Sequence, residues 1–312
     1  MTTAAPGFGV LSISDVTING SIIPVDWHNA VSSVVVMRGI NQASTIIIQL
    51  TDPKRTILNS SGFLQQGATL QIPDGFGNYL EFVFVQVNKA SDQLQLTFES
   101  RAVYDLRNLT GILSSSNITS AAAFAQGICA EVGVPFVGPV NNPYIQPQVY
   151  ATSTGTSYNP HEDAWTSLQR IASTLGWRCW ESANTVFFGP DEYWVNQASP
   201  PVNNYYFHSV PTLTEFTETV QLIDYDWDVG APFGDVTITA ISPLWQYNPG
   251  ELVNLANVGP ANGLWLVSSM QRDFFNAQAT ITCTIPMPTP LVLTPPVTRV
   301  IGGRPIFGDS YQ

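Results

Sequence analysis

Three alternating aspartates in the second half of the chain have the spacing closest to that of a chemical site. They are Asp224, Asp226 and Asp228, and Asp235 follows them. Alternate residues of a β-strand lie on one face, so the three carboxylates are expected to share a surface. Asp235 takes the last position of a calcium loop counted from Asp224, but that loop requires glutamate there and glycine at its sixth position, which is Val229. We therefore predict no metal site and interpret the run as an acidic strand.

The histidines do not predict a nucleophilic or zinc centre. His161 and Glu162 begin like the zinc-protease helix motif, yet Trp165 stands where the second histidine is required. Glu162 is interpreted as the capping-box partner of Asn159 at a helix start. The remaining histidines have no cysteine or serine elbow nearby; they are His28 and His208.

The cysteines are odd in number and widely separated, which excludes a disulfide framework and ligand spacing. They are expected to be small buried apolar residues; they are Cys129, Cys179 and Cys283. No glycine-rich loop precedes a helix, so no phosphate cradle is predicted. We predict no catalytic residue, no metal and no cofactor.

Two other functions remain as alternatives. Acid pairs for glycoside hydrolysis need not be close in sequence, so a cell-wall or glycan hydrolase stays open. The eight tryptophans also suit a carbohydrate-binding module. However, four of them fall at predicted core or interface positions; they are Trp165, Trp177, Trp180 and Trp265.

A three-strand module that occurs twice must position these residues. Residues 67–99 and 250–285 each contain a glycine, a short alternating strand, a turn, a long apolar strand and a final alternating strand. Such a repeat predicts two similar β-barrel or β-sandwich domains in a mainly β chain. We place them at residues 1–108 and 201–286.

A small α+β insertion is predicted between them, at residues 109–200. Apolar residues at helical spacing indicate helices at about 120–132 and 160–175. A hairpin is expected at 177–188, after the stop at Gly176. Residues 287–312 are rich in proline and are predicted to form an extended C-terminal arm.

Charge is sparse and strongly acidic. Only 11% of residues are charged and the net charge is −12. There is no lysine or arginine between Arg178 and Arg272. Such a surface argues against tight binding of a phosphate backbone. No apolar run is long enough for a membrane span, and the N-terminus lacks a signal-peptide pattern.

The order of these parts resembles the baseplate hub, or tail-tip hub, proteins of tailed bacteriophages, a family that includes minor tail proteins of long-tailed phages. The resemblance covers roughly residues 10–286. It rests on the residue patterns, and on the order of these patterns, in segments 44–50, 80–85, 94–98, 101–105, 164–177, 250–252, 264–267 and 270–273.

The resemblance implies tail-tube-like β domains and a homotrimeric structural protein of the virion, made in the host cytoplasm. Its two β domains would form a pseudo-sixfold ring at the tail tip that joins a sixfold tube to threefold tip proteins. The expected partners are a distal tail protein, a tape-measure protein and tip or fibre proteins, and DNA would pass without specific binding. Asp224, Asp226 and Asp228 would then face the lumen. No enzymatic domain is implied.

Overall fold

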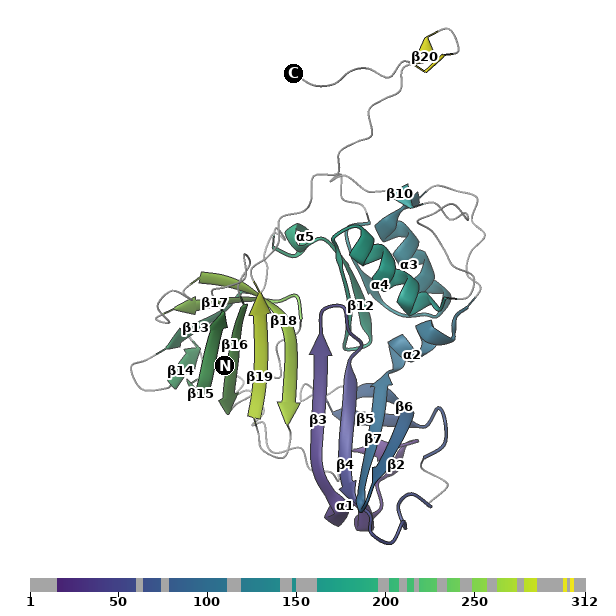
Figure 1. Ribbon diagram of the computed structural model, residues 1–312, viewed down its shortest axis with the longest axis vertical. Helices are drawn as coiled ribbons and strands as arrows, with labels where there is room; N and C mark the ends of the chain where they lie inside the picture. Colours follow the sequence, from purple (N-terminus) through teal and green to yellow (C-terminus); the bar gives the residue numbers. More distant parts are fainter. Residues whose placement is uncertain are drawn as a thin grey trace, which may run out of the picture.

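The computed structural model (Figure 1) describes residues 16–59, 64–73, 79–110, 119–140, 148–149, 162–195, 202–207, 212–215, 219–228, 235–241, 249–256, 263–273, 278–284, 300–301 and 304–305. One mostly antiparallel sheet of fourteen strands contains most of the described strands. The prediction of a mainly β chain is therefore confirmed.

The described residues of the first β part form a short helix, α1 (Val25–Ala30), and seven strands. The strands are β1 (Thr17–Ile18), β2 (Ser21–Ile22), β3 (Val31–Gly39), β4 (Thr45–Thr51), β5 (Thr69–Pro73), β6 (Tyr79–Ala90) and β7 (Gln93–Ser100). Asn19 and Gly20 turn β1 into β2 with φ of 51° and 73°, as a two-residue hairpin requires. Buried aliphatic and aromatic residues alternate along β3, β4 and β7 and form one apolar core.

The second β part also has seven strands among its described residues. They are β13 (Val202–Phe207), β14 (Thr212–Glu215), β15 (Thr219–Asp228), β16 (Asp235–Ile241), β17 (Leu252–Ala256), β18 (Gly263–Asp273) and β19 (Gln278–Thr284). β17 pairs with both β13 and β18. Following the pairings from β17 through β13, β14, β15, β16, β19 and β18 therefore leads back to β17. β18 also pairs with β3, which joins the two parts into one sheet (Figure 1).

Five strands of each part are arranged in the same order. β3-β4-β7-β6-β5 in the first part matches β15-β16-β19-β18-β17 in the second, and every neighbouring pair is antiparallel. The registers also match. Each strand has its own constant offset in residue number: 191 for β3, 190 for β4, 183 for β5, 183 for β6 and 185 for β7. Adding these offsets to a residue pair of the first part gives the corresponding residue pair of the second part.

The irregularities of the strands coincide as well. The β3–β4 register shifts at Ser32, and the β15–β16 register shifts at the corresponding Ile223. The β6–β7 and β18–β19 registers shift at Val85 and at the corresponding Ser268. Bulges re-aim a strand at a defined position, so shared bulges mean that corresponding strands bend at corresponding points.

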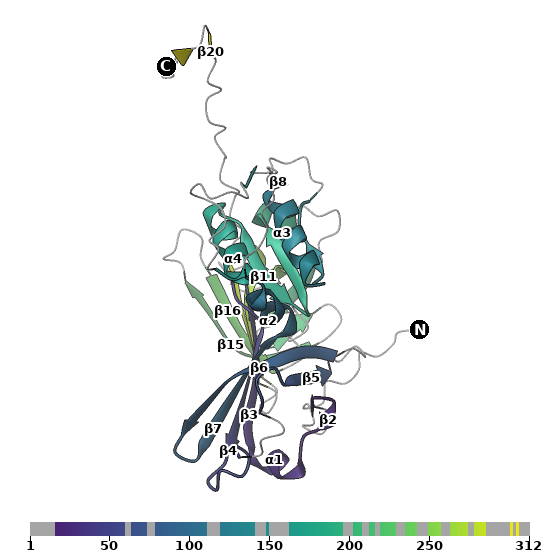
Figure 2. The same ribbon diagram turned by 90° about the vertical axis from the view of Figure 1, so that its right-hand side faces the viewer.

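The middle unit lies above the first β part (Figures 1 and 2). Its elements are α2 (Arg101–Asn108), β8 (Thr119–Ser120), α3 (Ala121–Glu131), β9 (Phe136–Val137), β10 (Gln148–Val149), α4 (Ala164–Thr174), β11 (Arg178–Ser182), β12 (Thr185–Gly189) and α5 (Asp191–Val195). The helices pack on the three-stranded sheet β11-β12-β9 through a second apolar core. That core includes Trp165 and Trp177, as predicted for these tryptophans.

The predicted cap of α4 is wrong. Asp163 caps the helix, and its Oδ1 accepts a hydrogen bond from Thr166 N at 2.8 Å. Glu162 instead accepts hydrogen bonds from Ser167 Oγ at 2.9 Å and Arg170 Nε at 3.0 Å. Asn159 lies outside the described residues. An acid one residue before the helix competes well for the free N–H groups of the first turn, and sequence spacing did not separate the two alternatives.

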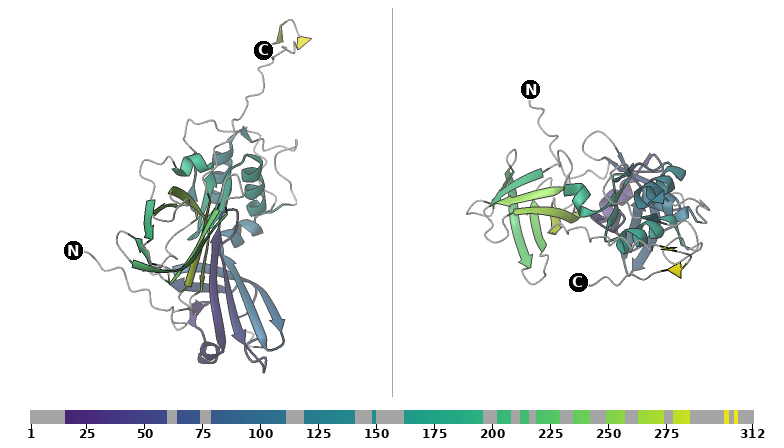
Figure 3. Two further views of the ribbon diagram at one scale, coloured as in Figure 1. Left: turned by 60° about the vertical axis from the view of Figure 1, so that its left-hand side comes forward. Right: turned by 90° about the horizontal axis from the view of Figure 1, so that it is seen from above.

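The three parts meet at a small aromatic cluster. Trp180 stacks on Phe187 with ring centroids 5.2 Å apart and meets Trp194 edge-on at 4.9 Å. Ile40 of the first β part and Leu252 of the second pack against the same cluster. Seen from above, the second β part lies beside the other two and not beneath them (Figure 3).

No helix among the described residues is long and apolar enough to cross a membrane. In the predicted C-terminal arm, β20 (Val300–Ile301) and β21 (Arg304–Pro305) pair antiparallel. The rest of that arm lies outside the described residues.

Two glycines at corresponding positions offer a matched test of the aromatic cluster. Gly67 and Gly250 have φ of 84° and 88°. A Cβ on Gly250 would overlap the Trp180 indole, whereas a Cβ on Gly67 would lie 3.8 Å from its nearest neighbour, Tyr104 Oη. Gly67→Ala should lower the free energy of unfolding by about 1–2 kcal/mol through backbone strain alone. Gly250→Ala should cost a further ~1–3 kcal/mol through overpacking.

Urea unfolding of both variants and the parent protein measures this difference. Equal losses for the two variants would contradict the tight contact between Gly250 and Trp180.

Candidate assembly interface

The sheet has one face turned away from its apolar cores, which we call the open face. The described residues on it are Ser33, Val35, Met37, Thr45, Ile47, Gln49, Gln86, Asn88, Gln95, Thr97, Asp235, Thr237, Thr239, Ser269, Gln271, Asp273, Thr280, Thr282 and Thr284, all half-buried or exposed. Direct cross-strand pairs link these residues from each strand to the next. The open face therefore runs continuously across the β18–β3 junction.

Threonines form the centre of the open face in the second β part. The hydroxyl oxygens of Thr239 and Thr280 are 3.2 Å apart, and those of Thr237 and Thr282 are 3.4 Å apart. The set of described open-face residues contains aspartates and no lysine or arginine. Hydroxyls, amides and acids on one face leave no cation to hold a phosphate.

The three aspartates singled out in the sequence lie in β15, the strand next to β16. Asp224, Asp226 and Asp228 pair with Thr239, Thr237 and Asp235 of β16. These partners are exposed or half-buried. Asp224 and Asp235 thus lie on two paired strands, an arrangement different from a helix-flanked calcium loop. Within the described part of the chain, no group of three or more potential metal ligands gathers.

The β18–β3 junction buries two cations on the other face of the sheet. Met270 pairs with Arg38, and Arg272 pairs with Val36. Arg38 is 5% exposed and Arg272 is 3% exposed. Burial lowers the pKa of Arg272 to about 10. Both guanidinium groups are therefore enclosed by the union of the two β parts.

A buried carboxylate attaches the middle unit to the start of β4. Glu181 accepts hydrogen bonds from Ser44 N at 3.3 Å and from Asn184 N at 2.7 Å. Ser44 Oγ donates to Glu181 O at 3.0 Å. Burial raises the pKa of Glu181 above its ordinary value of 4.5, while Ser44, Ser100, Asn184 N–H and Arg38 act in the opposite direction.

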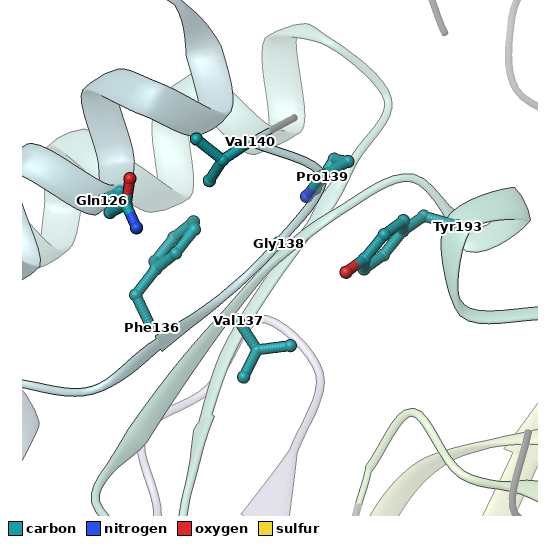
Figure 4. A pocket seen from close by; sticks show the side chains of 7 residues that line it. All are labelled: Gln126, Phe136, Val137, Gly138, Pro139, Val140 and Tyr193. Atoms are coloured by element: carbon teal, nitrogen blue, oxygen red, sulfur yellow. The ribbon is translucent and has the colours of Figure 1, made fainter. Parts of the chain in front are cut away.

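Two pockets were compared with the geometry that catalysis requires. The first, of about 430 Å³, is lined by Gln126, Phe136, Val137, Gly138, Pro139, Val140 and Tyr193 (Figure 4). The lining has no carboxylate, imidazole or thiol. The second, of about 540 Å³, contains Glu99, which forms an ion pair with Arg107 at 2.9 Å. Glu99 is the one carboxylate in its lining, and glycoside hydrolysis ordinarily uses two.

The other residues weighed in the sequence occupy structural positions. Cys129, Cys179 and Cys283 are free and buried, as expected, and burial raises the pKa of Cys129 and Cys283 to about 12. Such thiols are poor nucleophiles. His28 lies in α1, whereas His161 and His208 fall outside the described residues.

Solved structures with a similar fold include bacteriophage tail proteins. A tail protein from Neisseria meningitidis MC58 matches with a TM-score of 0.58 at 12% identity, over 86% of this chain and 95% of that one. The 43 kDa tail protein of prophage MuSo2 from Shewanella oneidensis matches with a TM-score of 0.57 at 11% identity, over 87% and 96%. The chain has the fold of bacteriophage tail proteins. The tail-protein fold agrees with the resemblance found in the sequence.

A third structure with this fold comes from a secretion system. It is an E. coli component of the type VI secretion system, described as structurally similar to the bacteriophage T4 tail proteins gp27 and gp5. It matches with a TM-score of 0.57 at 15% identity, over 88% of this chain and 77% of that one. No protein-family model matches the chain, and no curated protein sequence does.

Sequence reasoning missed the junction and the buried acid. Arg38, Glu181 and Arg272 each look like surface residues in the sequence. One signal was available for Glu181. It follows Trp180 directly and Cys179 by two residues, so in a strand it lies on the same face as a cysteine that was expected to be buried.

Glu181 should make stability depend on pH in a defined direction. A raised folded-state pKa means that the folded protein holds the proton more tightly, so its contribution is fully present below pH 4.5. That contribution is lost as the pH rises through the folded pKa. Glu181→Gln removes the titration, so the variant should lose less stability than the parent between pH 4.5 and pH 8.

Urea unfolding at several pH values measures the difference, with Glu131→Gln on the exposed end of α3 as control. Parallel pH profiles for the parent and Glu181→Gln would contradict the assignment.

Proposed function

We propose that this chain is a structural protein of a bacteriophage virion and forms a trimeric, pseudo-sixfold hub at the tail tip. The hub would join the sixfold tail tube, or distal tail ring, to threefold tip proteins. Its partners would be a distal tail protein, a tape-measure protein and tip or fibre proteins. The protein would be made in the host cytoplasm and located in the virion.

The observation that carries this proposal is the repeated set of five strands. β3 to β7 and β15 to β19 share strand order, register and two bulge positions. A chain with two such units presents six of them when three chains surround one axis. Such a ring can contact a neighbouring protein assembly of threefold symmetry on one side and one of sixfold symmetry on the other.

We assign the parts as two tube-like β domains at residues 1–108 and 201–286, a middle domain at 109–200 and an arm at 287–312. The last element of the first range, α2, packs into the apolar core of the middle domain. The tail-protein fold supports this division. Trp180 would place the middle domain between the two β domains, because it lies in one cluster with Ile40 of the first and Leu252 of the second.

The open face is proposed to line the channel for the tape-measure protein and DNA. Its described residues are uncharged or acidic. A DNA backbone would find no lysine or arginine there to replace its counterions, so it would pass without specific binding. Asp224, Asp226 and Asp228 would extend this lining through β15.

We propose no enzymatic role. The alternatives from the sequence, a glycan hydrolase and a carbohydrate-binding tail module, gain no specific observation from the described pockets.

The proposal predicts a trimer on the tail axis. The purified chain should have the mass of three copies by light scattering, and cryo-electron microscopy of assembled particles should place three copies in a ring around the channel. A peripheral position, or a ring of six chains, would contradict the hub. Peptidoglycan turnover that a single Asp or Glu substitution abolishes would instead favour the hydrolase.

A further inference from the structure

Two strand edges of this chain lack strand partners among the described residues. β5 pairs with residues 79–83 of β6, which leaves residues 86–90 paired to β7 alone. β14 pairs with residues 219–221 of β15, which leaves residues 224–228 paired to β16 alone. Unpaired edges expose a row of N–H and C=O groups and promote association with another strand.

The chain already contains a junction between strands of these two types. β18 corresponds to β6, and β3 corresponds to β15. In the β18–β3 junction, residues 269–273 pair antiparallel with residues 35–39. Transferring this pairing through the constant register offsets places Asn88 opposite Asp228, Lys89 opposite Trp227 and Ala90 opposite Asp226.

The burial of corresponding residues differs as a missing partner would require. Val87 lies on the core face, opposite the buried Leu96, yet it is 39% exposed. Its counterpart Met270 is 1% exposed, because β3 covers it. Val85 is 44% exposed. The two valines belong to the few large apolar residues described as exposed, and they mark an edge suited to a partner.

Charge does not oppose this pairing. Lys89 corresponds to Arg272, the cation enclosed at the β18–β3 junction, and donates a hydrogen bond to Asp52 O of its own chain at 3.4 Å. Neighbouring residues of a strand face opposite sides, so Lys89 faces the other side of the sheet from the positions of Asp226 and Asp228. The residues placed opposite these aspartates, Ala90 and Asn88, are neutral and add no like-charge repulsion.

We propose that the β6 edge of one chain pairs antiparallel with the β15 edge of a second copy, in the register of the β18–β3 junction. Each junction in the assembly is then of one kind, whether it lies within a chain or between chains. This head-to-tail contact uses different surfaces on the two copies, so it can be repeated around a ring. The number of chains in the ring rests on the proposed function; the pairing does not.

Disulfide trapping tests the register. Asn88→Cys with Asp228→Cys should form an interchain disulfide under mild oxidation, giving covalent dimers and trimers on a non-reducing gel. The matched control is Met37→Cys with Gln271→Cys, the corresponding pair within one chain, which should form an intrachain disulfide. Directly opposed strand residues have Cα atoms about 4.5–5.5 Å apart, which a disulfide can span.

Single-cysteine variants at 88 and 228 report background, and the three native cysteines are buried. A trimer by mass whose 88/228 pair stays reduced, while the 37/271 pair oxidises, would overturn this inference and leave the proposed hub intact. Covalent chains longer than three would support the edge pairing and overturn the ring of three. A monomer without interchain disulfides would overturn both.

A second variant tests the apolar edge without cysteines. Val87→Asp should shift the assembly to monomers, and the monomer should still fold because Val87 is 39% exposed in the single chain. Circular dichroism of the monomer checks that it is folded. Val87→Ile is the conservative control and should stay assembled. Val87→Asp that remains assembled like the parent would overturn the inference.

Discussion

The backbone pairing of β18 with β3 is the contact on which the architecture depends. These strands are more than two hundred residues apart, and their hydrogen bonds turn two β parts into one fourteen-stranded sheet. A sheet edge buried without a partner would leave N–H and C=O groups unsatisfied, which costs about 1–3 kcal/mol for each group. The pairing removes that cost and also encloses Met270, Arg38 and Arg272.

The middle unit supports this junction from one end. Trp180 packs against Ile40 and Leu252, which belong to different β parts, and Glu181 in the same strand binds Ser44. The aromatic side chains bury apolar area at this contact. The Glu181 carboxylate fixes the orientation of the middle unit, because its hydrogen bonds require donors at defined positions. The ribbon β11–β12 therefore fixes the position of both β parts at once.

The same fold leaves one face uncharged or acidic and places its buried arginines on the other. Strand alternation makes this separation, since a residue and its neighbours in sequence point to opposite sides. Threonine suits the open face for two reasons: its branched Cβ favours the strand, and its hydroxyl pairs with a second threonine across it.

The sequence by itself determined the mainly β class, the helices near α3 and α4, and the burial of Trp165, Trp177 and the cysteines. These features follow from local periodicity and turn chemistry, which a short window contains. It did not reveal α2, or the capping of α4 by Asp163, because several polar residues near a helix start compete for the same N–H groups.

Only the tertiary structure decided which strands become neighbours. The β18–β3 pairing, the burial of Glu181 and the shared register of the two five-strand sets depend on contacts between residues far apart in sequence. Long-range pairing is selected by the closing of whole cores and sheet edges, and no single segment encodes it. The acidic run at 224–228 was visible in the sequence, but its pairing with residues 235–239 of β16 came from the tertiary structure.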